Sequence, residues 1–276
     1  MTQPSVGRTA VSQPSVGSPR LHLRRTDSTN ARARALAAAG APHGMVVTAT
    51  FQDSGRGRQG RTWVAPAGRA LLCSVVVRDP PRLLPLVAGV AVAETVEAVR
   101  PPDPVSKVWE YVETGGPAAV ALKWPNDVQL RGRKVAGILV EGRPQERWAV
   151  VGIGLNVAVR AEDFPPELRR IAATIGLEPA SIPPTLARLM QALDRWLVMP
   201  ERAVLDAFRV RDALIARQVR WVQGGAADAE RREGRASGID DDGRLLIITG
   251  DGETVALDSG EVHLTPDPGS DPSRSV

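Results

Sequence analysis

From about residue 21 onward, apolar and polar positions alternate regularly enough to predict secondary structure. Short apolar runs bounded by glycine, proline or charged residues are typical of buried strands. The chain has such runs at residues 45–51, 70–77, 135–140 and 148–157. We expect the last two strands to be joined by a short turn at residues 142–145.

Helical spacing of apolar residues marks other segments. Residues 83–99 show it most clearly and predict a helix packed on the sheet. The stretch NARARALAAA predicts a second helix, with Asp27 or Ser28 as its N-cap and Gly40 as its C-terminal stop. Two more helices are predicted over residues 183–198 and 201–217. Together these elements predict an α+β domain over residues 21–217.

The pattern changes after these helices. Short alternating segments separated by GG, DDG and GDG turns predict a small all-β domain, a barrel or a sandwich, over residues 218–267. Residues 1–20 repeat QPSVG and residues 268–276 are polar, so we expect both stretches to be disordered tails. Residues 101–117 are bounded by proline and glycine and are predicted to be an inserted surface loop.

Composition narrows the class of protein. A chain of 276 residues with 43% hydrophobic content can bury a sizeable core. It has no apolar run long enough to span a bilayer and no secretory signal pattern, so we expect a soluble cytoplasmic protein without membrane contacts. The single Cys73 excludes a disulfide framework. Only three of the 35 basic residues are lysines, which indicates a compositional bias toward arginine rather than nucleic-acid binding.

The stretch FQDSGRGRQGRTW, residues 51–63, contains the spacing G-x-G-x-x-G of a dinucleotide-binding turn. That turn requires a helix directly after the glycines, and here Pro66 and Gly68 block one. The guanidinium groups of Arg56, Arg58 and Arg61 can instead bind phosphate or carboxylate. The segment therefore fits a loop that closes over an anionic ligand, with a solvated turn between two strands as the alternative.

Further polar side chains stand at fixed points around the predicted strands. KWPNDV, residues 123–128, combines a lysine, an amide and a carboxylate that suit phosphate and Mg²⁺, although a plain Asn-Asp turn would also explain it. RKVAGILVE, residues 133–141, places a lysine at the start of an apolar strand. In GIGLNV, residues 152–157, Asn156 is the only polar side chain of its strand. Glycines inside these strands indicate close approach by a ligand or another backbone.

Taken together and in this order, these motifs resemble those of the biotin protein ligase family. The matching stretches are DSTN (27–30), FQDSGRGRQGRTW (51–63), KWPNDV (123–128), RKVAGILVE (133–141) and GIGLNV (152–157). The resemblance covers roughly residues 21–160, and the remainder agrees in layout. It implies a class II synthetase-like catalytic domain with a mixed sheet, followed by a small SH3-like β-barrel.

The resemblance also implies an activity. Such ligases activate biotin with ATP to form biotinyl-5′-AMP, and then transfer biotin to a lysine of a carboxyl-carrier protein. It implies catalytic roles for Lys134, Arg58 and Asp127. The residues implied for biotin are Ser28, Thr29, Asn30, Gln52, Arg56, Gly57, Arg58, Lys134, Gly137 and Leu139. Those implied for ATP are Arg58, Arg61, Trp63, Lys123, Asn126, Lys134 and Asn156, with Mg²⁺ carried by ATP and Asp127 as its candidate neighbour.

Two alternatives remain at this point. A lipoate or octanoate ligase shares the fold and the acyl-adenylate chemistry, but the double Gly-Arg loop together with KWPND favours biotin. A nucleic-acid-binding module would use the arginine-rich loop, but the chain has few aromatic residues to interleave with it. No helix-turn-helix pattern precedes the predicted domain, so we expect no specific DNA binding. The expected partner is a biotin carboxyl-carrier domain, and the expected state is a monomer or a weak homodimer.

Overall fold

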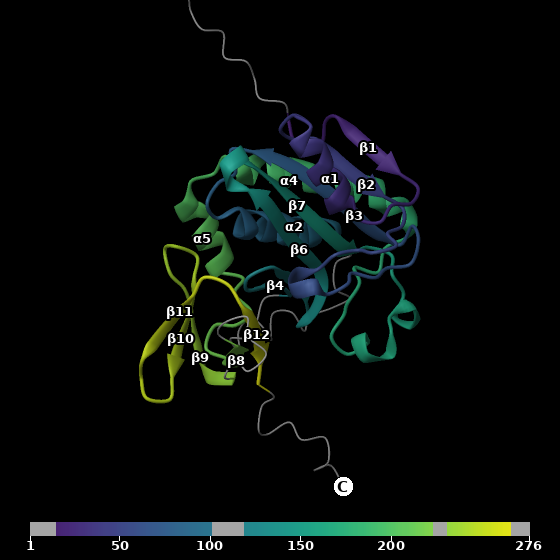
Figure 1. Ribbon diagram of the computed structural model, residues 1–276. Coiled ribbons are helices and arrows are strands. Elements are labelled where there is room, and N and C mark those ends of the chain that lie inside the picture. Colours follow the sequence, from purple (N-terminus) through teal and green to yellow (C-terminus); the bar gives the residue numbers. More distant parts are fainter. Residues whose placement is uncertain (1–14, 101–118, 223–230, 266–276) are drawn as a thin grey trace, which may run out of the picture.

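The protein is described from a computed structural model, which covers residues 15–100, 119–222 and 231–265. A seven-stranded sheet forms the centre of the larger domain (Figure 1). Its strands are β1 (Arg20–Leu23), β2 (Val46–Ala49), β3 (Ala70–Arg78), β4 (Val120–Lys123), β5 (Asp127–Leu130), β6 (Arg133–Arg143) and β7 (Trp148–Asn156). They lie in the order β1-β2-β3-β7-β6-β5-β4. Among the neighbouring strand pairs of this sheet, the β1–β2 pair is parallel and the others are antiparallel. The sheet is therefore mixed, as the resemblance implied.

The continuous apolar runs form β2, β3, β6 and β7, as predicted. Residues of β3 and β7 are buried almost throughout, because helices or loops cover both faces of the middle of the sheet. The short strands β1, β4 and β5 were not predicted. They have four residues each, which is too few for a period to stand out in the sequence.

Four α-helices accompany this sheet within the described residues: α1 (Thr29–Ala38), α2 (Leu84–Val99), α4 (Ile182–Leu197) and α5 (Glu201–Arg209). Ser28 caps α1 through a hydrogen bond accepted from the Ala31 backbone N–H, and Gly40 follows its end at a φ of 90°. Single-turn 3₁₀ segments are η1 (Arg58–Gly60), η2 (Pro144–Glu146), η3 (Ala161–Asp163), η4 (Pro166–Leu168) and η5 (Pro179–Ser181).

The helix predicted over residues 201–217 was wrong in its second half. α5 ends at Arg209, because the following residues pair with the edge strand β4 instead of continuing the helix. The Leu122 backbone N–H donates to the Arg211 carbonyl over 2.7 Å, and the Ala213 N–H donates to the Leu122 carbonyl over 3.0 Å. These bonds satisfy an edge that would otherwise be open.

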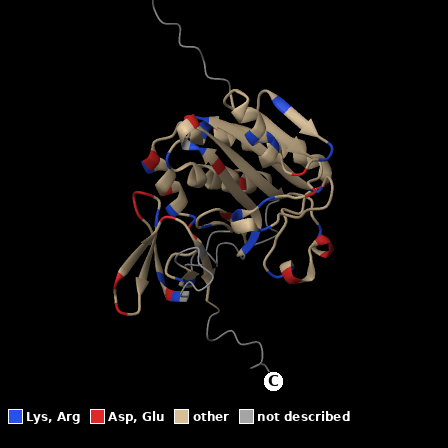
Figure 2. Cartoon of the chain, viewed as in Figure 1, with Lys and Arg blue, Asp and Glu red and all other residues tan. Residues whose placement is uncertain are grey.

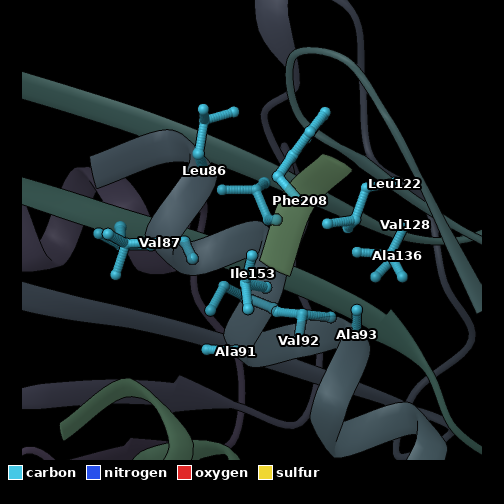
Figure 3. Close-up of a cluster of buried hydrophobic side chains, with 14 of the residues drawn as sticks. Leu86, Val87, Ala91, Val92, Ala93, Leu122, Val128, Ala136, Ile153 and Phe208 are labelled. Atoms are coloured by element: carbon cyan, nitrogen blue, oxygen red, sulfur yellow. The ribbon is translucent and has the colours of Figure 1, made fainter. Parts of the chain in front are cut away.

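The main hydrophobic core lies between α2 and the sheet (Figure 3). α2 is apolar on nearly every face because the sheet, α4 and α5 surround it. Leu86, Val87 and Val92 of α2 are buried together with Ile153 of β7 and Phe208 of α5. This packing fixes the strands whose ends and loops carry the polar motifs.

The predicted all-β domain is a five-stranded antiparallel sheet with the order β11-β10-β9-β8-β12. Its strands are β8 (Gln218–Val222), β9 (Arg231–Ile239), β10 (Leu245–Thr249), β11 (Thr254–Leu257) and β12 (Glu261–Leu264). The turn between β9 and β10 rests on the larger domain. The Trp124 indole N–H donates to the Gly243 carbonyl over 3.0 Å, and Arg82 forms ion pairs with Glu201 and Asp242.

The expected N-terminal tail needs a correction where the structure describes it. Val16 is buried, its N–H donates to Asp194 Oδ1 over 2.9 Å, and the Gly17 N–H donates to the Gly44 carbonyl over 2.8 Å. One valine inserted between α4 and the sheet therefore anchors residues that composition alone marked as disordered. Residues 1–14, the predicted loop 101–117 and the tail 268–276 lie outside the described residues.

Cys73 lies on β3 in the core, as its apolar surroundings predicted. It is fully buried, and this burial raises the pKa of its thiol to about 12. The helices that the structure describes are all too short or too polar to cross a lipid bilayer.

Candidate active site

The glycine-arginine segment forms a loop between β2 and β3 that folds back on itself. The Gly57 N–H donates to the Arg61 carbonyl over 2.7 Å, and the Trp63 N–H donates to the Gly55 carbonyl over 2.9 Å. The loop borders a cavity of about 670 Å³, whose lining consists of residues 53–62 together with Leu139 and Glu141. Figure 2 shows basic residues gathered along this loop. We call residues 53–62 the arginine loop.

The arginine loop is not a dinucleotide-binding turn. After Gly60 the chain runs to β3 without an α-helix, so it has no helix N-terminus for a pyrophosphate. Its glycines serve a different purpose. A Cβ atom on Gly55 would lie 2.3 Å from the Trp63 carbonyl oxygen, so glycine is required where the two sides of the loop cross.

The arginine loop meets the KWPND turn between β4 and β5. Arg58 Nη1 donates to Asn126 Oδ1 over 3.2 Å. Asn126 is itself fixed to β6, because its Nδ2 donates to the Ile138 carbonyl and its own carbonyl accepts from the Ile138 N–H. The half-buried Arg58 has a lowered pKa, first because of burial, yet a guanidinium remains charged throughout the physiological range.

Beside this contact lies a small group of charged side chains. Lys134 Nζ is 2.6 Å from Asp127 Oδ1. Lys123 is half-buried, and its pKa is held below the ordinary value of 10.5, mainly by burial and further by Lys134 and Arg61, against the attraction of Asp127. We call Arg58, Lys123, Lys134 and Asp127 the charged cluster. Positive charge exceeds negative charge there, so an anion would be attracted to it.

The floor next to the charged cluster is formed by backbone. A Cβ atom on Gly154 of β7 would lie 2.4 Å from the Trp63 ring, and one on Gly137 of β6 would lie 3.1 Å from it. The two glycines therefore make room for the indole, which lies close to both strands. Lys134 Nζ stands 5.7 Å from the ring centroid, within cation–π range.

A second, uncharged group lies at the start of α1. Gln52 Oε1 accepts from the Thr29 backbone N–H at 2.7 Å and lies 3.0 Å from Thr29 Oγ1. Ser74 Oγ lies 2.8 Å from Thr29 Oγ1 and 2.6 Å from Asn30 Oδ1. We call Thr29, Asn30, Gln52 and Ser74 the hydroxyl–amide cluster. Ser28 is buried beside it as the N-cap of α1.

Glu141 connects the hydroxyl–amide cluster to the arginine loop. It accepts from Asn30 Nδ2 at 2.9 Å and from Arg34 Nη1 at 2.9 Å, and it stands 3.9 Å from Arg56 Nη1. Glu141, Ser74 and Arg34 were not predicted as site residues. A hydroxyl in the middle of the apolar run LLCSVVV was the available signal for Ser74, because a buried hydroxyl has to find a partner.

The predicted site residues thus fall into groups. Arg56, Gly57, Arg58, Arg61 and Leu139 line the cavity. Asn156 ends β7 and is linked through Ala173 to the backbone of Lys134, because the Ala173 N–H donates to the Lys134 carbonyl over 2.7 Å. Its Nδ2 donates to the Ala173 carbonyl over 2.9 Å, and its buried Oδ1 has no hydrogen-bond partner among the described residues. The remaining predicted residues lie in one of the two clusters or beside them: Ser28, Thr29, Asn30, Gln52, Trp63, Lys123, Asn126, Asp127, Lys134 and Gly137.

Metal ligands are sparse at this site. In the part of the chain that the structure describes, no three His, Cys, Asp or Glu side chains come together in a way that could hold an ion. Asp127 is the carboxylate of the charged cluster, and its nearest cation is Lys134. A single carboxylate suits Mg²⁺ that arrives with most of its coordination supplied by phosphates and water.

Two family models and several known proteins are similar to this chain. A family model described as the biotin/lipoate A/B protein ligase family matches residues 22–157, and a model of the biotin protein ligase C-terminal domain matches residues 226–264. The biotin–[acetyl-CoA-carboxylase] ligase of Mycobacterium tuberculosis is 36% identical over 253 residues, which cover 88% of this chain and 88% of the relative. That of Paracoccus denitrificans is 35% identical over 245 residues, covering 82% of this chain and 92% of the relative.

A solved structure is similar over nearly the whole chain. The biotin protein ligase from Aquifex aeolicus in complex with biotin and ATP superposes with a TM-score of 0.68 at 25% identity. The alignment covers 90% of this chain and 99% of that chain. The larger domain and the small C-terminal sheet therefore both have counterparts in that protein.

Proposed function

This chain belongs to the biotin protein ligase family, and we propose that it activates biotin with ATP and transfers the biotin to a lysine of a carboxyl-carrier domain. One observation of the structure carries the proposal. The arginine loop and the start of β6 bring Arg58 and Lys134 to the same KWPND turn, at the edge of the cavity.

In the first step, an oxygen of the biotin carboxylate attacks the α-phosphorus of ATP. The bond from that phosphorus to the bridging oxygen breaks, and pyrophosphate leaves with the electron pair. The product is biotinyl-5′-AMP, a mixed anhydride. Both reactants are anions, so fixed cations have to lie where they meet.

Arg58 and Lys134 are the residues proposed to neutralise these anions. Arg58 can bind two oxygens side by side, whereas Lys134 acts as a point charge. Lys134 is paired with Asp127 over 2.6 Å, and an incoming phosphate or carboxylate would compete for the same ammonium. Lys123 and Arg61 add positive charge around the triphosphate.

The uncharged parts of the site are proposed to hold the rings. The hydroxyl–amide cluster offers hydrogen bonds to the ureido ring of biotin, and Gly137 and Leu139 of β6 provide an apolar wall for its chain. Trp63 offers a flat face to adenine, and its ring lies beside Gly137 and Gly154. Asn126 and Asn156 are assigned to the nucleotide.

In the second step, the amine of the carrier lysine attacks the carbonyl carbon of the anhydride. The carbon–oxygen bond to phosphate breaks, AMP leaves, and the amine loses a proton as the amide forms. Asp127 is proposed to accept that proton once its lysine has turned to the phosphate. Mg²⁺ would arrive on the phosphates of ATP, where it supplies charge neutralisation, with Asp127 as its candidate protein neighbour.

The direct test is to incubate the protein with biotin, Mg²⁺-ATP and a biotin carboxyl-carrier domain, and to probe the carrier by avidin blot. We expect labelling that requires both ATP and biotin. A parallel reaction with excess lipoate should leave labelling unchanged, whereas competition by lipoate would favour the related lipoate ligases. A carrier that stays unlabelled would overturn the proposal.

The reaction consumes ATP, and we propose that the protein acts in the cytoplasm.

A further inference from the structure

The hydroxyl–amide cluster is short of one hydrogen. Ser74 Oγ contacts Asn30 Oδ1 and Thr29 Oγ1, and Thr29 Oγ1 contacts Gln52 Oε1, all within 3.0 Å. The two amide oxygens are acceptors only, and each hydroxyl carries a single proton. The two hydroxyl protons must therefore serve three oxygen–oxygen contacts, and one contact has none.

The orientation of the Asn30 amide settles where the first proton goes. Its Nδ2 donates to the Leu139 carbonyl and to Glu141 Oε2, at 3.3 and 2.9 Å. The reversed amide would place Oδ1 against these two oxygens, which is unfavourable for a side chain only 3% exposed. Oδ1 therefore faces Ser74, and Ser74 has to donate its proton to Asn30.

The remaining proton belongs to Thr29, and the better acceptor for it is Ser74. Ser74 Oγ is fully buried and has given its own proton away, whereas Gln52 Oε1 already accepts from the Thr29 backbone N–H. With the Thr29 proton turned inward, Thr29 Oγ1 and Gln52 Oε1 face each other at 3.0 Å as two acceptors without a hydrogen between them. A ligand N–H can supply that hydrogen.

The backbone around Ser74 leaves little freedom for another arrangement. Ser74 lies opposite Gly152 in the β3–β7 pair, and a Cβ atom on Gly152 would lie 2.0 Å from Asn30 Oδ1. The Asn30 side chain thus fills the space that this glycine leaves. At the other end of the cluster, Gln52 is only half-buried and its Nε2 lies beside Gly55 of the cavity lining.

We propose that Ser74 is a specificity-determining positioning residue, which turns the Thr29 proton inward so that Thr29 and Gln52 present oxygen acceptors to a ring that carries N–H donors. The proposal rests on the proposed function, since biotin has such N–H groups on its ureido ring. A dithiolane ring such as that of lipoate has none. Ser74 acts through Thr29 and does not itself touch the ligand.

The test is a double-mutant cycle on the full-length protein, read by steady-state kinetics of carrier labelling. Ser74→Ala should raise the KM for biotin about tenfold, the scale of one hydrogen bond, with the KM for ATP and kcat nearly unchanged. Thr29→Val should raise it at least as much. The double variant should be no worse than Thr29→Val alone, because both changes remove the same acceptor.

Controls separate this role from simple loss of packing. Thr95 of α2 is equally buried and donates only to the Ala91 carbonyl, so Thr95→Val should leave the KM for biotin unchanged. If Ser74→Ala does not fold, Ser74→Cys fills the same space with a weak donor and should show a smaller rise in the same KM.

The outcomes are distinct. A folded Ser74→Ala protein with an unchanged KM for biotin would overturn the proposal, and so would effects that multiply in the double variant. A biotin analogue methylated on the ureido nitrogens should be discriminated against less by Ser74→Ala than by the wild type. No labelling by the wild-type protein would instead overturn the proposed function, which leaves the two failures distinguishable.

Discussion

The two ends of the candidate site are built in different ways. In the hydroxyl–amide cluster, neutral groups bond to one another and to α1, β3 and β6, and each is buried or half-buried. In the charged cluster, three cations share one carboxylate, and one of them comes from the arginine loop. The neutral groups are therefore held in place by hydrogen bonds within the chain. The charged cluster instead has more positive than negative charges.

This difference indicates how each end recognises a ligand. Neutral groups in fixed positions discriminate by the direction of hydrogen bonds, because a ligand that fails to match leaves buried atoms unpaired. Uncompensated cations attract any suitable anion and contribute most where negative charge develops. We therefore expect substitutions at the charged end to reduce turnover, and substitutions at the neutral end to change ligand preference.

The largest effect is expected for Lys134→Ala. Removing the ammonium that is proposed to reach the α-phosphate should slow pyrophosphate release about 10²–10³-fold, in line with the loss of one preorganised charge donor. Arg133→Ala is the matched control, since its exposed neighbouring side chain can be removed without touching the charged cluster. Pyrophosphate release at the wild-type rate in Lys134→Ala would show that the two ends do not differ as described.

The Arg58→Lys variant tests whether a positive charge alone is sufficient for adenylate formation at the charged cluster. Lysine keeps the charge but loses the planar fork and the contact with Asn126, so we expect about 10–100-fold slower formation of the adenylate. The measurement is the same pyrophosphate release under saturating biotin. Arg32→Lys, on the exposed side of α1, should have no effect. Equal rates for Arg58→Lys and the wild type would mean that a point charge suffices.

Trp124→Phe tests whether the small β domain supports the charged end. Phenylalanine keeps the buried ring but removes the N–H that donates to the Gly243 carbonyl. The loss of about 1 kcal/mol should lower Tm by about 2–4 °C. Adenylate formation should also slow several-fold, because Asn126 and Asp127 follow in the same turn.

A matched control is available in Trp148→Phe. Trp148 is equally buried and donates to Glu146 Oε2 over 2.7 Å, away from the cavity. This variant should lose similar stability without any change in rate. If both variants affect the rate alike, or neither does, the contact between the domains is structural only.

The smallest effect is expected for Lys123→Met, and it has the opposite sign for stability. Burial lowers the pKa of Lys123, so the folded protein is penalised for carrying the charged form. The variant should gain about 2 °C in Tm at neutral pH while binding ATP more weakly. The penalty is full below the lowered pKa and disappears as the pH rises toward 10.5, so the gain should vanish there. A gain that persists in alkali would point to packing instead.

Sequence patterns predicted the parts of the fold that repeat over many residues. The apolar runs of β3 and β7 and the helical spacing of α2 are long enough to exceed chance. The end of α5 could not be found in this way, since it depends on backbone bonds between Leu122 and residues 211–213. Val16 was missed for a similar reason, because one buried side chain leaves no period.

The candidate site likewise has parts that the sequence predicted and parts that depend on the fold. Motifs predicted the charged end because several unusual residues follow one another, as in the turn that contains Lys123 and Asp127. Their pairing across distant segments, such as Arg58 with Asn126, required the fold. At the neutral end Ser74 and Glu141 were missed. Ser74 stands alone in an apolar run, and Glu141 lies near the end of β6, where an acidic residue is ordinary.

The indole of Trp63 has a calorimetric consequence. It already covers part of Gly137 and Gly154, which are half-buried, so a ligand that settles on these strands exchanges one apolar neighbour for another. The net apolar area withdrawn from solvent would then be smaller than the area of the ligand itself. Since that area governs the heat-capacity change of binding, the change should be small and negative. The Trp63→Ala variant should show a more negative heat-capacity change of binding, because the ligand would then displace water from the surface of β6 and β7.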